Sequence, residues 1–286
     1  MENNESLSIL EVVTKSSEYL ERKGVPNYKI DAEWLVAFVL GCKRMDLYLR
    51  YGEILGGNIL SKIKTLVMRR GSRIPLQHIL GQVQFAGLTL KSDNRALIPR
   101  CETEFLVDIL HNRLTANFNG KIADLGSGSG AIILALCSMM PHATGCGFDN
   151  SQKAISLAKE NLSFCDQEDH VCFKEFDWRK QNQLPEPYDL IISNPPYLSH
   201  DEWDQAEPEV KMYDPSNALV AQKQGLSDIE NVIEVAINSL PPKGYLALEF
   251  GASQAEIVGD LLTERFTFEI MADQFLIRRF VLAVKK

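Results

Sequence analysis

The sequence predicts an α/β protein with a mostly parallel sheet and an antiparallel C-terminal edge, preceded by a small helical bundle. Three observations indicate this fold class. Apolar residues recur at helical spacing as far as Val67, and the period changes to two between Val83 and Leu90. After Pro99, short strand-like runs alternate with helical stretches, which is typical of a parallel sheet with helices on both faces. The 286 residues suffice for about two domains.

The N-terminal helices are predicted from three apolar stripes, which Gly24–Asn27 and Gly56–Asn58 separate. The stripes are Leu7, Leu10, Val13 and Leu20; Trp34, Leu35, Phe38 and Val39; and Ile59, Leu60, Ile63, Leu66 and Val67. Basic residues gather near the end of this region, at Lys62, Lys64, Arg69, Arg70 and Arg73. This cluster predicts a solvated helix face or, alternatively, a docking surface for an acidic or RNA-bearing partner.

A β-hairpin is predicted next, because apolar residues alternate on both sides of the turn at Ala86-Gly87. Parallel strands are predicted at Ile122–Leu125, Gly145–Phe148, Cys172–Phe176, Leu190–Ser193 and Tyr245–Glu249. Helices are predicted at Phe105–Leu114, Ile132–Met140, Ala154–Leu162 and Leu226–Leu240. Phe266–Ile270 and Arg279–Val284 have no predicted helix between them and form the antiparallel edge. The expected division is a helical domain over 1–75, a hairpin connector over 76–98 and an α/β domain over 99–286.

Composition excludes several classes of protein. Hydrophobic residues make up 45% and charged residues 24%, values typical of globular proteins, and the net charge of −8 argues against stable nucleic-acid binding. The six cysteines form no C-x-x-C pair or zinc-ligand cluster, so we expect reduced, mostly buried thiols and no metal. Residues 1–5 lack signal-peptide character, and the apolar run from Ala131 to Met140 is too short to span a membrane. These features predict a cytoplasmic protein without membrane contact.

A glycine-rich segment follows the first strand of the α/β region and opens a helix. It contains Gly126, Ser127, Gly128, Ser129 and Gly130. Such a turn lets a ligand approach the backbone closely. Because it fits both a dinucleotide fingerprint and a methyl-donor site, the segment alone leaves NAD and S-adenosylmethionine open.

Polar or aromatic residues follow the next three strands. Asp149 ends the second strand, where a carboxylate can bind both ribose hydroxyls, and Asp177-Trp178 follows the third, where an acceptor and a flat ring suit an adenine. A tryptophan after a strand is more often a core residue. The carboxyl ends of parallel strands share one edge of the sheet, so these residues together predict a nucleoside pocket.

The tetrapeptide Asn194-Pro195-Pro196-Tyr197 follows the fourth strand, on the same predicted edge. Two prolines make the loop stiff and remove two backbone donors. An asparagine carbonyl, the Pro195 backbone carbonyl and the Tyr197 ring together suit a planar NH2 group, which a hydride-transfer enzyme would not need. We therefore predict that Asn194, Pro195 and Tyr197 are catalytic, and that Pro196 completes the substrate contact.

These segments resemble the class I S-adenosylmethionine-dependent methyltransferases that modify NH2 groups, which have a Rossmann-like fold. Three further segments narrow the resemblance to the peptide-chain release factor glutamine N5-methyltransferases of the HemK/PrmC family. They are Arg73–Gly81, Leu97–Glu104 and Glu207–Val210. The chain departs from the family pattern at Cys101, where a proline is usual, and at Ala221–Gln224.

The resemblance implies transfer of a methyl group from S-adenosylmethionine, with S-adenosylhomocysteine as product, to the glutamine of the Gly-Gly-Gln motif in class 1 release factors. It implies that Asn194 contacts cofactor as well as substrate, that residues 1–75 dock the substrate, and that the box at Leu97–Glu104 helps to shape the cleft. Two alternatives stay open. One is a nucleic-acid amino-group methyltransferase acting on adenine N6 or guanine N2, and the other is a non-catalytic module that binds release factors.

Overall fold

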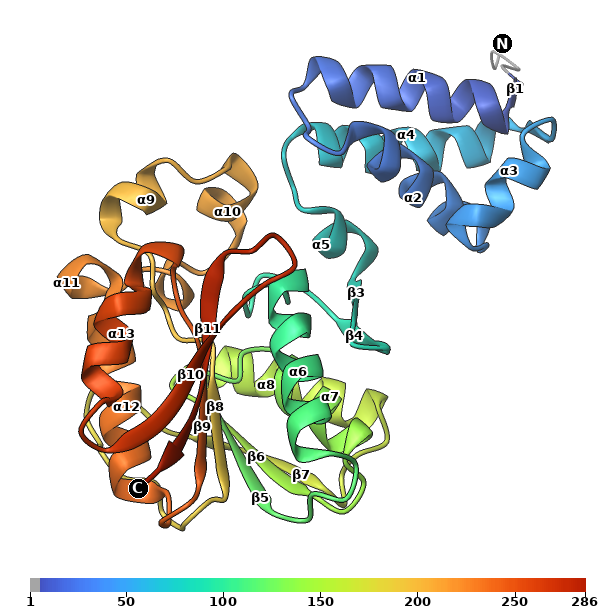
Figure 1. Ribbon diagram of the computed structural model, residues 1–286. Coiled ribbons are helices and arrows are strands. Elements are labelled where there is room, and N and C mark those ends of the chain that lie inside the picture. Colours follow the sequence, from blue (N-terminus) through green and yellow to red (C-terminus); the bar gives the residue numbers. More distant parts are fainter. Residues whose placement is uncertain (1–5) are drawn as a thin grey trace. The chain divides into compact units, whose positions relative to one another are not determined.

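The computed structural model describes residues 6–286, which divide along the chain into two compact units, with the boundary between Gly81 and Gln82 (Figure 1). Residues 1–5, on which the expectation of a missing signal peptide rested, lie outside the described residues. Within residues 6–286, no helix combines the length and the apolar character that crossing a membrane requires.

The N-terminal unit is a bundle of helices, as predicted. Its helices are α1 (Ile9–Arg22), α2 (Tyr28–Leu40), α3 (Leu47–Arg50), α4 (Gly57–Gly71) and α5 (Leu76–Leu80), and the short strands β1 (Leu7–Ser8) and β2 (Ile54–Leu55) pair antiparallel. A capping box starts α1: the Ser8 hydroxyl accepts from the backbone N–H of Glu11, and the Glu11 carboxylate accepts from the N–H of Ser8. Ile9, Leu20, Leu35 and Ile63 fill the core of the bundle.

The predicted stripes are wrong for four side chains, since Leu10, Trp34, Phe38 and Ile59 are exposed. Helix α2 is apolar around most of its circumference, so its sequence does not identify the side that faces the bundle; Ala32 and Val36 lie there. The predicted solvated basic face is also wrong at Arg70. The Arg70 guanidinium is buried, and its Nε lies 2.7 Å from Asp31 Oδ2.

We expect Asp31→Ala to destabilise the helical unit by about 3 kcal/mol, because the Arg70 charge would stay buried without this carboxylate. Hydrogen-exchange mass spectrometry of α2 and α4 peptides in the full chain measures this change. Glu53→Ala is the control, since it breaks the exposed Arg50–Glu53 pair and should cost under about 1 kcal/mol. Equal losses in the two variants would contradict the expectation.

The second unit contains a seven-stranded sheet in the order β10-β11-β9-β8-β5-β6-β7. Its strands are β5 (Lys121–Leu125), β6 (Thr144–Asp149), β7 (Val171–Glu175), β8 (Leu190–Ser193), β9 (Tyr245–Glu249), β10 (Phe266–Ala272) and β11 (Arg278–Lys285). Strands β5 to β9 pair in parallel, and β11 runs antiparallel to both β9 and β10. The five parallel strands and the antiparallel edge are therefore confirmed.

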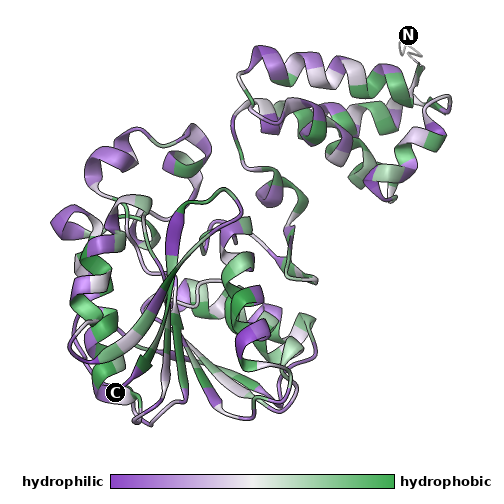
Figure 2. Ribbon diagram, viewed as in Figure 1, coloured by the Kyte–Doolittle hydropathy of each residue, from purple (hydrophilic) through white to green (hydrophobic). Residues whose placement is uncertain are grey.

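Helices cover both faces of this sheet (Figure 1). One face packs against α6 (Cys101–Leu114), α7 (Ala131–Met139) and α8 (Gln152–Phe164), and the other against α12 (Ser227–Ser239) and α13 (Ala255–Leu262). Figure 2 shows the central strands as predominantly hydrophobic, as expected for strands covered on both sides. The sequence did not predict α13 or the short helices α9 (His200–Asp204), α10 (Pro208–Tyr213) and α11 (Gln222–Gly225).

The predicted hairpin forms, as β3 (Gln82–Phe85) and β4 (Leu88–Lys91). Phe85 and Leu90 are buried in the core beside α6 and α7, and the Lys91 N–H donates to Asn161 Oδ1 of α8 at 2.7 Å. These contacts tie the hairpin to the α/β unit. The predicted division into a helical domain, a hairpin connector and an α/β domain, with boundaries at residues 75 and 98, stays a prediction.

The six cysteines are free thiols, but the prediction that most are buried is wrong. Cys137 and Cys146 are buried, Cys42 and Cys165 are half-buried, and Cys101 and Cys172 are exposed. Exposed Cys101 begins α6, so the departure from the family pattern at this position lies at the surface.

Candidate active site

A narrow cleft lies at the carboxyl edge of the parallel strands, where open α/β sheets bind ligands. Its lining comes from the glycine-rich loop after β5, the end of β6 and the loops after β7 and β8. The predicted site residues that line it are Gly126, Gly128, Asp149, Trp178, Asn194 and Pro196. Segments that lie far apart in the sequence, from Arg95 to Ala218, are thus brought together.

The glycine-rich loop is shaped by positive backbone angles and close packing. Gly126 has φ +77°, and an added Cβ would lie 3.0 Å from the Trp178 ring. Gly130 has φ +83° and precedes α7, and a Cβ there would lie 2.7 Å from Phe173. Gly126 therefore lets the Trp178 ring lie close to the loop, and Gly130 lets the Phe173 ring pack against it.

Ser127 and Ser129 do not line the cleft. Both are buried, the Ser129 carbonyl accepts from Asn161 Nδ2 at 2.9 Å, and the Ser127 hydroxyl has no partner among the described residues. Asp124, which precedes this loop, is fully buried, and neither carboxyl oxygen has a hydrogen-bond partner in the described part of the chain. Burial, reinforced by the nearby charge of Asp149, raises the pKa of Asp124 to about 8.

Asp149 holds the glycine-rich loop against the end of β6. Its Oδ2 accepts from the Gly128 N–H at 2.9 Å, and its Oδ1 accepts from the Ser151 N–H at 2.8 Å. Burial raises the pKa of this carboxyl, and the backbone donors act in the opposite direction. Each carboxylate oxygen can accept more than one bond, so the group retains acceptor capacity toward the cleft that it lines.

Asp177 and Trp178 follow β7 but face different ways. The Trp178 ring lines the cleft, and its Nε1 donates to Asp228 Oδ1 at 2.7 Å. The Asp177 carboxylate lies 3.0 Å from Lys180 Nζ and accepts from the Arg179 N–H, and it does not line the cleft. The structure thus places only Trp178 where the sequence predicts an adenine contact.

The loop Asn194–Tyr197, called the acceptor loop from here on, starts directly after β8. Asn194 and Pro196 reach the cleft, Pro195 is buried, and the Tyr197 side chain packs against the core beneath α12 and α13. Gln254 Nε2 donates to the Tyr197 carbonyl at 3.1 Å. Asn194 and the cofactor-type residues therefore share one cleft, and the phenol lies behind it.

Gly225 lies directly against the acceptor loop. A Cβ at this position would lie 2.0 Å from the Tyr197 carbonyl oxygen, and Gly225 has φ +87°. The two preceding residues, Lys223 and Gln224, also have positive φ, of 52° and 56°. The backbone after the departure at Ala221–Gln224 can approach the loop this closely only because Gly225 has no side chain.

Hydrogen bonds connect both ends of the acceptor loop to one buried carboxylate. Asn194 Nδ2 donates to Thr103 Oγ1 at 3.1 Å, Thr103 Oγ1 donates to Glu249 Oε2 at 2.7 Å, and the Tyr197 hydroxyl donates to Glu249 Oε1 at 3.3 Å. Glu249 is 1% exposed, and burial raises its pKa to about 7 although both hydrogen bonds favour the charged form. Burial, followed by the charge of Glu249, also raises the pKa of Tyr197, so the phenol stays protonated.

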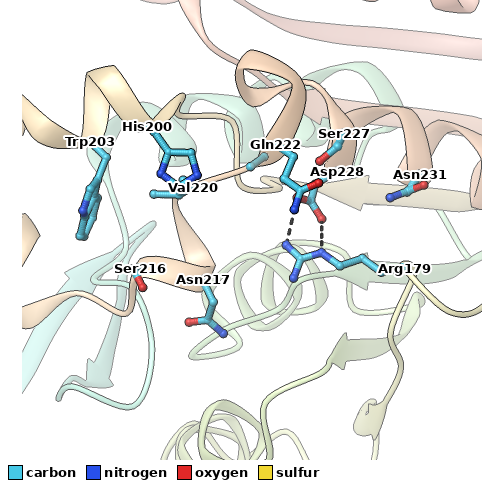
Figure 3. A pocket seen from close by; sticks show the side chains of 11 residues that line it. Arg179, His200, Trp203, Ser216, Asn217, Val220, Gln222, Ser227, Asp228 and Asn231 are labelled. Carbon is cyan, nitrogen blue, oxygen red and sulfur yellow. Dashed lines mark hydrogen bonds and ion pairs between the residues drawn. The ribbon is translucent and has the colours of Figure 1, made fainter.

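A larger pocket of about 650 Å³ lies beside the cleft (Figure 3). It shares Arg179 and Asn217 with the cleft, and Figure 3 shows Arg179 paired with Asp228, with Nε to Oδ1 at 2.8 Å. Trp203 and His200 lie on its other side. None of the predicted site residues lines this pocket.

Several residues of the cleft were not singled out from the sequence. Arg95, Ala96, Asn150, Ser151, Asn217 and Ala218 line it, and Leu97, from the predicted box, lines it too. Asn150 and Ser151 could have been inferred from their position after Asp149. Asn217 lies in a single 3-10 turn, Ser216–Ala218, which is too short to give a periodic signal in the sequence.

This fold, with a glycine-rich loop, an acidic strand end and the acceptor loop on one cleft, defines a class I S-adenosylmethionine-dependent methyltransferase. Family models described as PrmC N-terminal domain and Methyltransferase small domain match residues 11–81 and 102–214. In fold, the chain is similar to the 16S rRNA N2 G1207 methyltransferase of T. thermophilus, solved with AdoMet and guanosine. The TM-score is 0.52 at 16% identity, over 72% of this chain and 50% of that one.

Curated relatives identify the family. The release factor glutamine methyltransferase of Fusobacterium nucleatum is 38% identical over 89% of this chain and 72% of its own length. That of Deinococcus radiodurans is 34% identical over 97% of this chain and 98% of its own length. The protein therefore belongs to the release factor glutamine methyltransferase family.

Proposed function

We propose that this protein methylates the side-chain amide nitrogen, N5, of the glutamine in the Gly-Gly-Gln motif of class 1 peptide-chain release factors. The observation that carries the proposal is the position of Asn194, whose amide lies on the same cleft as Gly126, Gly128 and Asp149. The names of the curated relatives support the substrate class. A substrate from translation termination also favours a cytoplasmic location.

The cleft fits S-adenosylmethionine, the methyl donor of this class. Asp149 offers acceptors for a ribose, the Trp178 ring offers a flat apolar face, and the loop around Gly126 and Gly128 admits a ligand close to the backbone. When bound, the cofactor supplies a methyl group activated by a sulfonium.

The acceptor loop would orient the substrate amide. An amide nitrogen is a weak nucleophile because its lone pair is delocalised, so the site must hold it in line with the methyl group. Asn194 Oδ1 and the Pro195 carbonyl would each accept one N–H of the glutamine NH2, which raises electron density at nitrogen as charge develops. Because Tyr197 packs against the core and bonds Glu249, we assign its hydroxyl to holding the loop in place of the predicted direct contact with the substrate amide.

Mass spectrometry of a release factor after incubation with the protein and S-adenosylmethionine tests the proposal. The expected product carries one added methyl group on the Gly-Gly-Gln glutamine. Parallel incubations with DNA and RNA test the alternative of an adenine or guanine amino-group methyltransferase. Binding of the release factor without any methylation would instead support the non-catalytic module, and methylation of another residue would overturn the assignment of the glutamine.

A further inference from the structure

The hydrogen bonds behind the acceptor loop have a direction. An ionised carboxylate only accepts hydrogen bonds, so the Thr103 hydroxyl must donate its one hydrogen bond to Glu249. The Thr103 oxygen can then only accept, and its partner on Asn194 must be the NH2 group. The carbonyl oxygen of the Asn194 side chain is thereby left for the cleft.

This direction matters for a substrate that presents an NH2 group. If the Asn194 amide were turned by half a rotation, its own NH2 would face the substrate NH2, and neither could accept from the other. A neutral Glu249 removes the constraint, because a protonated carboxyl can donate to Thr103 and the hydroxyl can then donate to Asn194. The charge on Glu249 thus selects between two orientations of an amide that it does not touch.

We propose that Thr103 and Glu249 are positioning residues, which orient the Asn194 amide so that its oxygen faces the NH2 group of the substrate. The inference rests on the proposed function, since the orientation matters only for an acceptor with N–H donors. The bond from Tyr197 to Glu249 holds the other end of the loop on the same carboxylate.

The groups around Glu249 come from three elements. Helix α6 supplies Thr103 and Glu102, the acceptor loop supplies Tyr197, and β11 supplies Arg279. Glu102 raises the pKa of Glu249, while Arg279 lowers it from a position where its Nε lies 2.7 Å from Asp273 Oδ2. Thr103 is 4% exposed, so water does not readily substitute for its hydroxyl.

The first test removes the hydroxyl at constant shape. Thr103→Val should lower the single-turnover rate of glutamine methylation about 10- to 50-fold at saturating S-adenosylmethionine, since one directional hydrogen bond is lost. Thr103→Ser keeps the hydroxyl and should lie much closer to wild type. Affinities for cofactor and release factor should stay within about threefold in both variants. A wild-type rate for Thr103→Val, or equal losses for valine and serine, would overturn the proposal.

The second test is the pH profile. The ionised form of Glu249 is the productive one and its pKa is about 7, so the wild-type rate should fall about tenfold per pH unit below this value and level off above it. Glu249→Gln should lack this acid limb. Thr103→Val should lack it too, although Asp124 and Asp149 are intact, because Glu249 is then disconnected from Asn194. If Thr103→Val does not fold, the Glu249→Gln profile decides, and persistence of the limb in that variant would refute the proposal.

A readout without turnover comes from the side-chain amide resonances of Asn194 in the free protein, assigned by their loss in Asn194→Ala. They should shift with an inflection near pH 7 in the wild type and not in Glu249→Gln. A wild-type release factor reaction run in parallel separates the two proposals. If the wild type fails to methylate glutamine, the proposed function is wrong; if it succeeds while the Asn194 resonances ignore pH, the positioning role is wrong.

Discussion

Replacing Asn194 with alanine should lower the rate of glutamine methylation about 10²- to 10³-fold and leave S-adenosylmethionine bound, since the lost oxygen acts mainly on the developing charge of the amide. Asn194 lines the cleft, and its side-chain NH2 group donates a hydrogen bond to Thr103. A single-turnover assay measures the rate, and calorimetry measures cofactor binding.

Asn231→Ala is the matched control for this variant. Asn231 lines the larger neighbouring pocket and not the cleft, so its removal should change the rate by less than about threefold. If Asn231→Ala lost as much activity as Asn194→Ala, the reaction would have to be placed in the larger pocket.

Asp149→Asn should weaken binding of S-adenosylmethionine about 100-fold, because the charged acceptor for the ribose hydroxyls is lost and the Gly128 N–H loses its carboxylate partner. Wild-type affinity should fall as the pH drops through the pKa of this carboxyl, which burial raises, since protonation removes an acceptor. Titration calorimetry across a pH series measures both effects.

Asp177→Asn is the control, and it also tests a position at which the prediction from the sequence and the structure differ. The sequence predicts a cofactor contact for Asp177, but its carboxylate faces Lys180 outside the cleft. Affinity within about threefold of wild type is expected for this variant. A loss as large as that of Asp149→Asn would show that Asp177 turns toward the cofactor on binding.

The rim of the sheet was accessible to sequence reasoning because it depends on local patterns. Parallel strands end at a common edge, so Asp149 and Asn194 could be placed together from strand ends alone. The glycine-rich loop could also be recognised from the sequence, because its pattern of glycines is local. The direction in which a side chain points at that edge depends on the groups to which it bonds. Trp178 bonds Asp228 and lines the cleft, whereas Asp177 pairs with Lys180 and does not, and the sequence did not distinguish the two.

The support behind the rim was not accessible. Thr103 and Glu249 are separated by 146 residues, and their contact depends on how α6 and β9 pack in the folded protein. Neither residue type is unusual at its position: Thr103 lies in the acidic first turn of a helix, and Glu249 ends a strand. Likewise, the burial of Arg70 depends on Asp31 on another helix, and a count of basic residues along one helix does not reveal it.

The contact between Gly225 and the Tyr197 carbonyl places different limits on sequence change at Gly225 and at the preceding residues, Ala221–Gln224. The side chains of Gln222, Lys223 and Gln224 are exposed, so these positions can vary among residues that tolerate the positive φ of Lys223 and Gln224. Ala221 is buried and is more restricted. The glycine that follows has no such freedom, since any side chain there would displace the acceptor loop. Sequence drift before Gly225 is therefore compatible with a fixed reaction geometry, and a single substitution at Gly225 is not.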